Sequence, residues 1–479
     1  METFPMLWIR SGLVLAGVWC CGVTASVQAE VKLPKIFSSH MVLQRDRDIP
    51  VWGWDTPGTD VEVSLGDSTA SAKADDKGKW SVKLPPRKAG APLTLSVKGT
   101  TTAKYEDVLM GEVWLCSGQS NMEWTVNSSN YASSEIAAGN HPKIRHIKVQ
   151  HNPKDKPQED MNSSGWEVCS SKTVGNFTAV GYFFALSLQT ELNVPIGLIG
   201  SNWGGTRIEP WVTPDGFKAV PALKDISDKI DTFPHKNDKG QVNHQTPLAL
   251  YNGMIAPLVP YGIRGALWYQ GESNNGEGML YFEKQKALIE GWRKLWNDPQ
   301  MPFLFVQLAP FDYTGNSAST SGLPFLWEAQ TATLKIPNTG MAVTTDISAL
   351  KDIHPRNKQD VGKRLALWAL ANTYGKKGFA YSGPLYKSMV KEGDTIKITF
   401  DHANGGLITR DGKQLNHFTI AGADKKFVPA MAQIRGNEVI VRGVKDPVAV
   451  RFGWDEEAEP NLANRDVLPA SPFRTDDWK

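Results

Sequence analysis

Apolar and polar residues alternate along the first part of the chain after residue 30. Residues 61–65, 80–84 and 93–97 each place an apolar side chain at every second position, and Gly, Pro, Asp and Lys clusters separate these runs. A period of two is typical of half-buried strands, and short strands at this spacing indicate a small sandwich. The pattern therefore predicts a β-sandwich-like domain over residues 30–107.

The pattern changes at residue 108, where short apolar runs alternate with longer helical ones. Strands are expected at residues 112–116, 196–201, 264–269, 303–308 and 341–345, and helices at residues 179–193, 281–297 and 357–374. Such alternation predicts a mostly parallel sheet with helices on both faces, here over residues 108–377. From residue 378 to 479 the strand pattern returns, at residues 395–400, 438–441 and 448–452, and predicts a second small β domain that packs on the core.

The first 29 residues are typical of an export signal. Arg10 supplies positive charge, residues 13–23 form an apolar run, and small residues ending at Ala29 offer a cleavage site. We expect the mature chain to start at Glu30 and to be periplasmic or extracellular. The apolar run is short for a membrane span, and no later stretch is long and apolar enough to cross a bilayer.

Composition narrows the function further. The 479 residues include 52 Lys and Arg against 50 Asp and Glu, a net charge of +2, which argues against a nucleic-acid partner. Only Cys116 and Cys169 remain in the mature chain, and they form either a disulfide or two buried thiols. No Cys and His cluster has the spacing of a zinc site, so no metal is expected.

Candidate chemistry gathers where the predicted strands of the middle domain end. Ligands of open α/β sheets bind beyond the carboxyl ends of the strands. Four such ends are followed by small, polar and titratable residues: 117–122, 202–207, 269–274 and 346–355. We therefore place the functional site at this edge of the sheet.

These segments supply the parts of a serine hydrolase. Ser120 lies on a Gly-containing turn after a strand, where a nucleophile is exposed. His354 precedes a predicted helix and is placed to act as the base, with Asp352 or Asp346 to orient it. Oxyanion donors are expected from the Ser120 amide, the Gly204 and Gly205 amides and the Gln270 side chain.

Three motifs resemble the sialate O-acetylesterase family. They are Gly118-Gln119-Ser120-Asn121-Met122, Trp268-Tyr269-Gln270-Gly271-Glu272-Ser273-Asn274 and Asp352-Ile353-His354-Pro355-Arg356-Asn357-Lys358. This family belongs to the SGNH hydrolases, and the resemblance implies a flavodoxin-like three-layer α/β/α core with a parallel sheet. Acetyl xylan and other carbohydrate acetylesterases are relatives. The likeness covers the middle domain and extends to both flanks, including residues 468–478.

The resemblance assigns roles to individual residues. Ser120 matches the nucleophile, His354 the catalytic histidine, and Gly204 or Gly205 the oxyanion glycine, while Gln270 stands in the block where the wider superfamily has Asn. One departure concerns the acid: the position three residues before His354 is Lys351, so Asp352, Asp346 and Glu272 are rival partners. A Ser–His dyad is the remaining alternative.

The resemblance implies a secreted carbohydrate O-acetylesterase that needs no cofactor. Its expected substrate is 9-O-acetylated sialic acid; acetylated plant polysaccharide and an inactive sugar-binding relative are the alternatives. Arg207 either pairs with a sugar carboxylate or, as we favour, forms a salt bridge within the domain. Trp124, Trp203 and Trp268 are candidates for a stacking wall, although core packing is favoured for Trp268. The other candidate substrate contacts are Gln119, Asn121 and Glu272.

Overall fold

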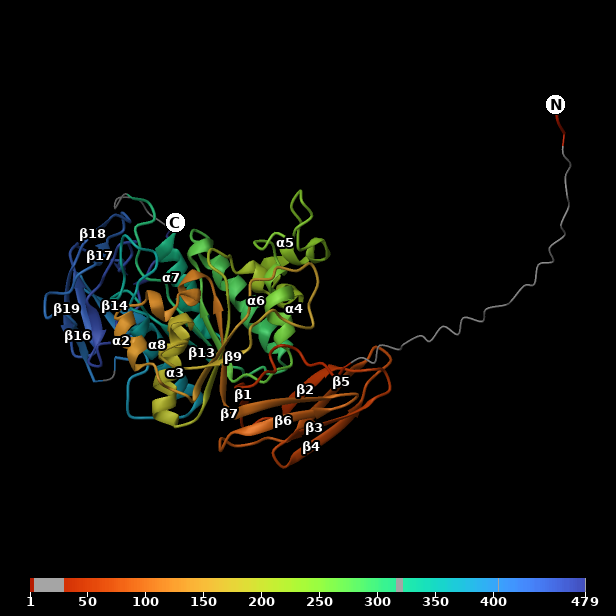
Figure 1. The fold of residues 1–479 in the computed structure, drawn as a ribbon. Helices are drawn as coiled ribbons and strands as arrows, with labels where there is room; N and C mark the ends of the chain where they lie inside the picture. The colour runs from red at the N-terminus through yellow and green to blue at the C-terminus, as the bar shows by residue number, and fades with distance from the viewer. Residues whose placement is uncertain (4–29, 316–321, 404, 479) are drawn as a thin grey trace.

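The computed structural model describes residues 1–3, 30–315, 322–403 and 405–478 (Figure 1). Most of the expected export signal, residues 4–29, lies outside the described residues. No described helix combines the length and apolar character needed to cross a membrane. Cys116 and Cys169 are both buried free thiols, and this decides between the two states expected from the sequence. Burial raises the pKa of the Cys169 thiol to about 11.

One long strand, β7 (Thr102–Gly118), joins the first β unit to the central sheet. Its first residues pair antiparallel with β6 (Leu93–Lys98), and its burial alternates there. From Val108 onward every residue is buried, because the strand now lies inside a sheet covered on both faces. The expected domain boundary between residues 107 and 108 thus lies inside this strand, at Asp107, whose φ is 54°.

The central sheet has the strand order β13-β12-β11-β7-β10-β8-β9. All neighbours pair in parallel except β8 and β9, which are antiparallel. Numbered along the chain, β10-β7-β11-β12-β13 has the order 2-1-3-4-5 of flavodoxin-like sheets, and β8 and β9 extend it. All five strands expected from the sequence are present in this sheet. Besides β7, its strands are β8 Ile144–Lys148, β9 Trp166–Val168, β10 Ile196–Asn202, β11 Gly265–Tyr269, β12 Phe303–Val306 and β13 Thr339–Ala342.

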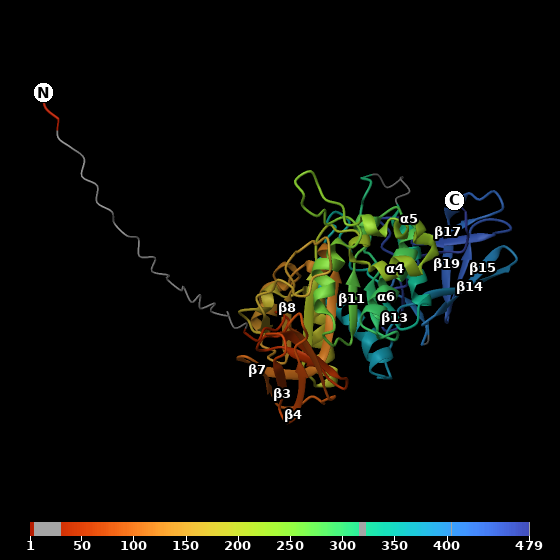
Figure 2. The ribbon, with the colours of Figure 1, turned by 90° about the vertical axis from the view of Figure 1, so that its right-hand side faces the viewer.

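Helices cover both faces of this sheet (Figures 1 and 2). On one face α3 (Ala179–Leu192) packs against α8 (Lys358–Trp368), and on the other α6 (Met279–Leu295) packs against α4 (Pro214–Ala219) and α7 (Leu323–Ala332). The three helices expected from the sequence are confirmed, with α8 continuing as a π-helical turn over Ala369–Thr373. The alternation of strand and helix patterns therefore predicted the layered core correctly.

The first β unit shares its hydrophobic core with the central sheet. Its strands are β1 Val42–Gln44, β2 Ile49–Trp54, β3 Asp60–Leu65, β4 Ser68–Lys73 and β5 Lys79–Leu84. The buried Glu112 carboxylate of β7 fastens this unit, since it accepts hydrogen bonds from Arg45 and from Arg264, each at 2.6 Å. Although burial raises the pKa of Glu112, the two guanidinium groups, Arg264 first, hold it below its usual range.

The last β unit has its own hydrophobic core. Its strands are β14 Leu385–Glu392, β15 Thr395–Asp401, β16 Leu407–Thr409, β17 Phe418–Ala421, β18 Phe427–Pro429, β19 Met431–Arg435, β20 Glu438–Arg442, β21 Ala449–Phe452, β22 Leu462–Asn464 and β23 Phe473–Arg474. Polar contacts that include Ser471 and Arg474 dock it on the central domain. Ser471 Oγ accepts a hydrogen bond from the Gln307 amide at 2.9 Å, and Arg474 binds both oxygens of Glu328 at 3.0 and 2.9 Å.

Candidate active site

Ser120 and His354 meet at the carboxyl edge of the central sheet. Ser120 is the first residue of the short helix α1 (Ser120–Glu123), which follows β7 directly. The turn requires Gly118, because its φ is 136° and a Cβ there would lie 2.2 Å from the Tyr269 carbonyl oxygen. His354 lies in the loop before α8, and its Nε2 is 2.9 Å from Ser120 Oγ. The Trp124 ring stacks on the imidazole, with ring centroids 4.6 Å apart.

Asp352 is the carboxylate beside His354. Its Oδ1 lies 3.8 Å from His354 Nδ1 and accepts the backbone N–H of His354 at 2.9 Å. The rival Asp346 is occupied elsewhere, because Arg364 donates to both of its oxygens at 2.7 Å. The expectation that Asp346 orients His354 is therefore wrong, because its carboxylate binds Arg364 instead. Asp352 is half exposed and its contact is longer than a hydrogen bond, so the pair resembles a loosely held triad.

The environment favours the neutral form of the His354 imidazole. Burial lowers its pKa below the ordinary 6.5, the nearby charge of Lys358 lowers it further, and Asp352 opposes both effects. A neutral imidazole with Nε2 facing a hydroxyl can accept the hydroxyl proton. The site therefore has the nucleophile and base arrangement of serine hydrolases.

A buried polar layer lies next to these two residues. Asn121 donates to Glu272 Oε1 at 2.5 Å and to the Ile353 carbonyl at 3.0 Å, and its own oxygen accepts from Lys358. Burial lowers the pKa of Lys358 to about 7 and raises the pKa of Glu272. Asn121 and the Glu272 carboxyl are buried, so they join the Ser120 helix to the His354 loop and do not form the expected substrate contact.

The loop after β10 carries Gly204 and Gly205 beside the serine. A Cβ on Gly204 would lie 3.3 Å from the Ser120 Cβ, which shows how closely the loop approaches. The Gly204 N–H donates to Glu123 Oε2 at 2.7 Å. Among the described residues no hydrogen-bond partner faces the N–H of Ser120 or of Gly205. These two amides are thus among the donors that are available in the loop and helix around Ser120.

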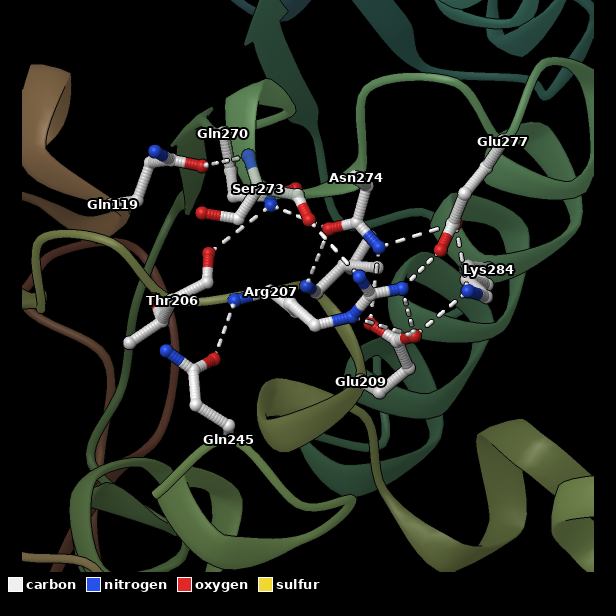
Figure 3. A network of polar contacts seen from close by, with 11 residues as sticks. Gln119, Thr206, Arg207, Glu209, Gln245, Gln270, Ser273, Asn274, Glu277 and Lys284 are labelled. Atoms are coloured by element: carbon white, nitrogen blue, oxygen red, sulfur yellow. Dashed lines mark hydrogen bonds and ion pairs between the residues drawn. The ribbon is translucent and has the colours of Figure 1, made fainter. Parts of the chain in front are cut away.

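Gln270 does not have the oxyanion role expected from the sequence. Its amide nitrogen donates to the Thr206 carbonyl at 3.2 Å and to Asn274 Oδ1 at 2.7 Å, and its oxygen accepts from the Tyr281 hydroxyl at 2.9 Å. The side chain is completely buried, so it cannot reach an oxyanion at Ser120 without breaking these bonds. It holds the loops after β10 and β11 together (Figure 3).

Gln119 has a similar supporting role. Its Oε1 accepts the backbone N–H groups of Gly271 and Ser273, both at 3.3 Å, and only 3% of the residue is exposed. It ties the turn before Ser120 to the loop after β11 (Figure 3). Gln119 is therefore bonded within the protein, so its expected contact with substrate stays a prediction that its burial does not favour.

Arg207 forms ion pairs within the domain, as favoured from the sequence. Its guanidinium binds Glu209 at 3.0 Å and also Glu277, and it donates to the Ser273 carbonyl at 3.1 Å (Figure 3). Lys284 binds the same two carboxylates at 2.7 Å each. Two acids and two bases thus neutralise one another, which leaves no uncompensated positive charge for a sugar carboxylate.

The expected stacking wall is mostly occupied by protein. Trp203 lies between two imidazole rings, His151 at 4.2 Å and His244 at 4.5 Å, so both of its faces are covered. Trp268 is 1% exposed and packs in the core, as favoured. Only Trp124, whose other face is not stacked by a described ring, keeps the expected position beside His354.

Sequence reasoning missed the charged residues that support this site. Glu123 lies one helical turn after Ser120, and this spacing could have indicated that the two side chains share a face. Lys358, by contrast, resembles an ordinary polar residue in the first turn of a helix, and its burial beside Glu272 has no local signal.

Comparison with known proteins identifies the family of this chain. Residues 110–371 match the family described as carbohydrate esterase, sialic acid-specific acetylesterase. The chain is 31% identical to mouse sialate O-acetylesterase over 94% of this chain and 95% of the relative, and 31% identical to the human protein over 97% of each. A solved carbohydrate acetylesterase from Xanthomonas citri superposes with a TM-score of 0.86 at 41% identity, covering 94% of this chain and 100% of that one. The chain therefore belongs to the sialic acid-specific acetylesterase family and is a carbohydrate acetylesterase.

Proposed function

We propose that this chain hydrolyses O-acetyl esters of sugars through an acetyl-enzyme on Ser120. The observation that carries the proposal is the 2.9 Å contact between Ser120 Oγ and His354 Nε2 at the carboxyl edge of the sheet. A serine hydroxyl is a weak nucleophile until a neighbouring base takes its proton. The neutral His354 imidazole, whose pKa burial lowers, supplies that base.

The reaction proceeds in two halves. His354 Nε2 takes the proton of Ser120 Oγ as the oxygen attacks the acetyl carbonyl carbon, and the same proton then goes to the departing sugar oxygen. Water repeats the sequence on the acetyl-enzyme and releases acetate. The free N–H groups of Ser120 and Gly205 are the proposed donors to the oxyanion. One such donor is worth roughly 3–4 kcal/mol in related reactions.

Asp352 completes the mechanism by holding the imidazole. It accepts the backbone N–H of His354 and faces Nδ1 at 3.8 Å, so it favours the orientation in which Nε2 points to Ser120. Its negative charge also stabilises the imidazolium that forms during the reaction. We assign Asp352 the role of the triad acid on this ground.

Two substrate classes compete for this site. The names of the mouse and human relatives support an O-acetylated sialic acid, and we propose its 9-O-acetyl form as the first substrate to test. The ion pairs of Arg207 with Glu209 and Glu277 favour the second class, acetylated neutral polysaccharide, because they leave no free cation for the sialate carboxylate. The similarity to the Xanthomonas citri carbohydrate acetylesterase is compatible with either class.

Acetate release from two substrates tests the proposal. O-acetylated mucin and acetylated xylan are compared with the native chain, with Ser120→Ala as the inactive form and Ser171→Ala, an exposed serine, as the matched control. We expect release from at least one substrate by the native chain and by Ser171→Ala only. A serine-directed fluorophosphonate should label the same two proteins. A folded native chain that takes no label would support a sugar-binding role without catalysis.

We also propose that the chain is exported after removal of residues 1–29. Export is supported by the positive charge near the start of the chain, the apolar run after it and the small residues before Glu30. Amino-terminal sequencing of protein recovered from the periplasm or the medium of a bacterial host should begin at Glu30. Recovery of the full-length chain from the cytoplasm alone would contradict it.

A further inference from the structure

A cavity of about 760 Å³ lies between the first β unit and the central domain. Strands β2 and β5 form one wall, and Tyr251, Leu295 and residues 157–159 form the other. Its volume falls within the roughly 300–1,000 Å³ that small-molecule sites occupy. The cavity does not include any residue of the Ser120 site.

Aromatic rings dominate the wall of this cavity. Trp52 and Trp54 of β2 are half-buried and share one face of this strand, and Tyr251 of the facing wall is 9% exposed. The buried indole N–H of Trp80 has no hydrogen-bond partner among the described residues. Trp80 pairs with Gly53 in the β2–β5 register and packs against it, so this N–H lies on the buried face of the strand pair, opposite to Trp52 and Trp54, and does not face the cavity.

The charges around the cavity cancel one another. Lys73 and Lys79 contribute two cations, Asp75 and Glu159 contribute two anions, and Lys79 is paired with Glu159. The backbone N–H groups of Lys77 and Lys79 both donate to Asp75 at 2.8 Å. A rim without net charge gives no preference for an anionic or cationic ligand, but offers many donors and acceptors to a neutral one.

We propose that this cavity is a second glycan-binding site, which holds a neutral oligosaccharide segment without cleaving it. The CH face of a pyranose ring is apolar and suits the face of an indole or phenol ring such as those of Trp54 and Tyr251, and its hydroxyls suit the polar rim. The inference goes beyond the proposed function, because it concerns binding of the polymer and not the ester.

The position of the cavity fits such a role. Ser120 follows the carboxyl end of β7, whereas the β unit that bounds the cavity pairs with the amino half of that strand. The strand has 17 residues, which at about 3.3 Å each gives a length along the strand of at most roughly 56 Å, shortened by the bend at Asp107. Figures 1 and 2 show the β2 and β5 unit at the end of the sheet where β7 enters. A bound glycan there would tether a long chain while another part of it reaches Ser120.

Affinity electrophoresis of the full chain tests the proposal directly. The Ser120→Ala form is run through gels that contain deacetylated xylan, xyloglucan or glucomannan, with deacetylated mucin as the anionic comparison. We expect retardation in at least one neutral glycan, and at least a tenfold weaker affinity when Trp54→Ala is added. Trp54→Tyr, which keeps an aromatic ring, should restore binding. Trp478→Ala, a half-buried tryptophan of the last β unit, is the matched control.

A second measurement separates this site from the catalytic one. With Ser120 intact, Trp54→Ala should hydrolyse the small ester 4-nitrophenyl acetate at the native rate but lose activity on acetylated polymer. The proposal is overturned if no neutral glycan retards the chain, if Trp54→Ala binds as well as the native form, or if Trp54→Tyr fails to restore binding although it melts like the native chain. Absence of activity on the small ester in the native chain would instead count against the proposed function.

Discussion

The backbone N–H of Gly204 donates to Glu123 Oε2 at 2.7 Å, and this bond ties the loop after β10 to the helix that begins at Ser120. The other carboxylate oxygen of Glu123 lies 2.8 Å from His151 Nε2 and accepts from Lys148 at 3.0 Å. Burial raises the pKa of Glu123, but these partners, His151 first, lower it to about 2. Glu123 therefore stays charged at any working pH and fixes the peptide that precedes Gly205.

Glu123→Ala should lower kcat because the Gly204 loop loses its fixed position. A hydrogen bond to a charged group is worth about 1.5–3 kcal/mol, which corresponds to a loss of roughly 10- to 100-fold. Glu123→Gln keeps an oxygen for the Gly204 N–H and should lose much less. Steady-state kinetics on a small acetyl ester measure both. If Glu123→Ala raised kcat instead, the carboxylate would be a competitor for an oxyanion donor and not a support.

The pH dependence of the reaction should report His354. Only the neutral imidazole can take the Ser120 proton, so kcat/KM falls as His354 becomes protonated. Burial and the charge of Lys358 lower the pKa of His354, so the acidic limb should have its midpoint below 6.5. Lys358→Met removes one of the two causes and should move the midpoint to higher pH. A native midpoint at or above 6.5 would contradict the environment described here.

The location of the site at the carboxyl edge of the sheet was predictable from the sequence, because parallel strands end at the same edge. Four strand ends carried polar residues, and two of them, through Ser120 and His354, supply the pair that meets at 2.9 Å. Hydrophobic periodicity likewise predicted the last β unit and the layered core. Strand β8 was missed because it carries Arg145 and His146 at buried positions, where periodicity expects apolar side chains.

The errors within the site have a common physical origin. A sequence shows which groups can donate or accept hydrogen bonds, but not which groups of the protein they bind in the fold. Gln270 forms its hydrogen bonds with Thr206, Asn274 and Tyr281. Asp346 binds Arg364, which lies in the following helix α8. Thr206 is 64 residues from Gln270, and although the other partners are 4 to 18 residues away, the folded loops and helices decide that these groups meet.

Asp352→Asn should cost less than the loss of a fully hydrogen-bonded triad acid. Its 3.8 Å separation from His354 Nδ1 and its exposure weaken the electrostatic support of the imidazolium. We expect kcat to fall by roughly 10- to 100-fold, against about 10⁴-fold in a tightly bonded triad. His354→Ala is the comparison and should lose far more. Equal losses for the two variants would show that Asp352 is as essential as the base.

Glu112→Ala should weaken the joint between the first β unit and the central sheet. The carboxylate is completely buried and binds Arg45 and Arg264, so its removal leaves two guanidinium groups without their partner. Breaking a buried ion pair in this way costs about 3–5 kcal/mol. Urea unfolding of the full chain measures the loss, and Glu106→Ala, an exposed glutamate of the same strand, is the control. A variant as stable as the control would mean that packing alone holds the joint.

The last β unit should be needed for the stability of the central domain. A chain that ends at residue 377 loses Ser471, and the buried Gln307 amide then lacks the hydroxyl that it donates to at 2.9 Å. It also loses Arg474, which binds both oxygens of Glu328. The Gln307 amide keeps its bonds to the Trp327 carbonyl and to the Thr331 hydroxyl. Each lost hydrogen bond is nevertheless worth about 0.5–1.5 kcal/mol, so the truncated chain should melt at a lower temperature than the full chain. Ser471→Ala should lie between the two, whereas Ser388→Ala, an exposed serine of the same unit, should melt like the native chain. If the truncated chain melted at the native temperature, the last β unit would be an independent module, and its contacts with Gln307 and Glu328 would not stabilise the central domain.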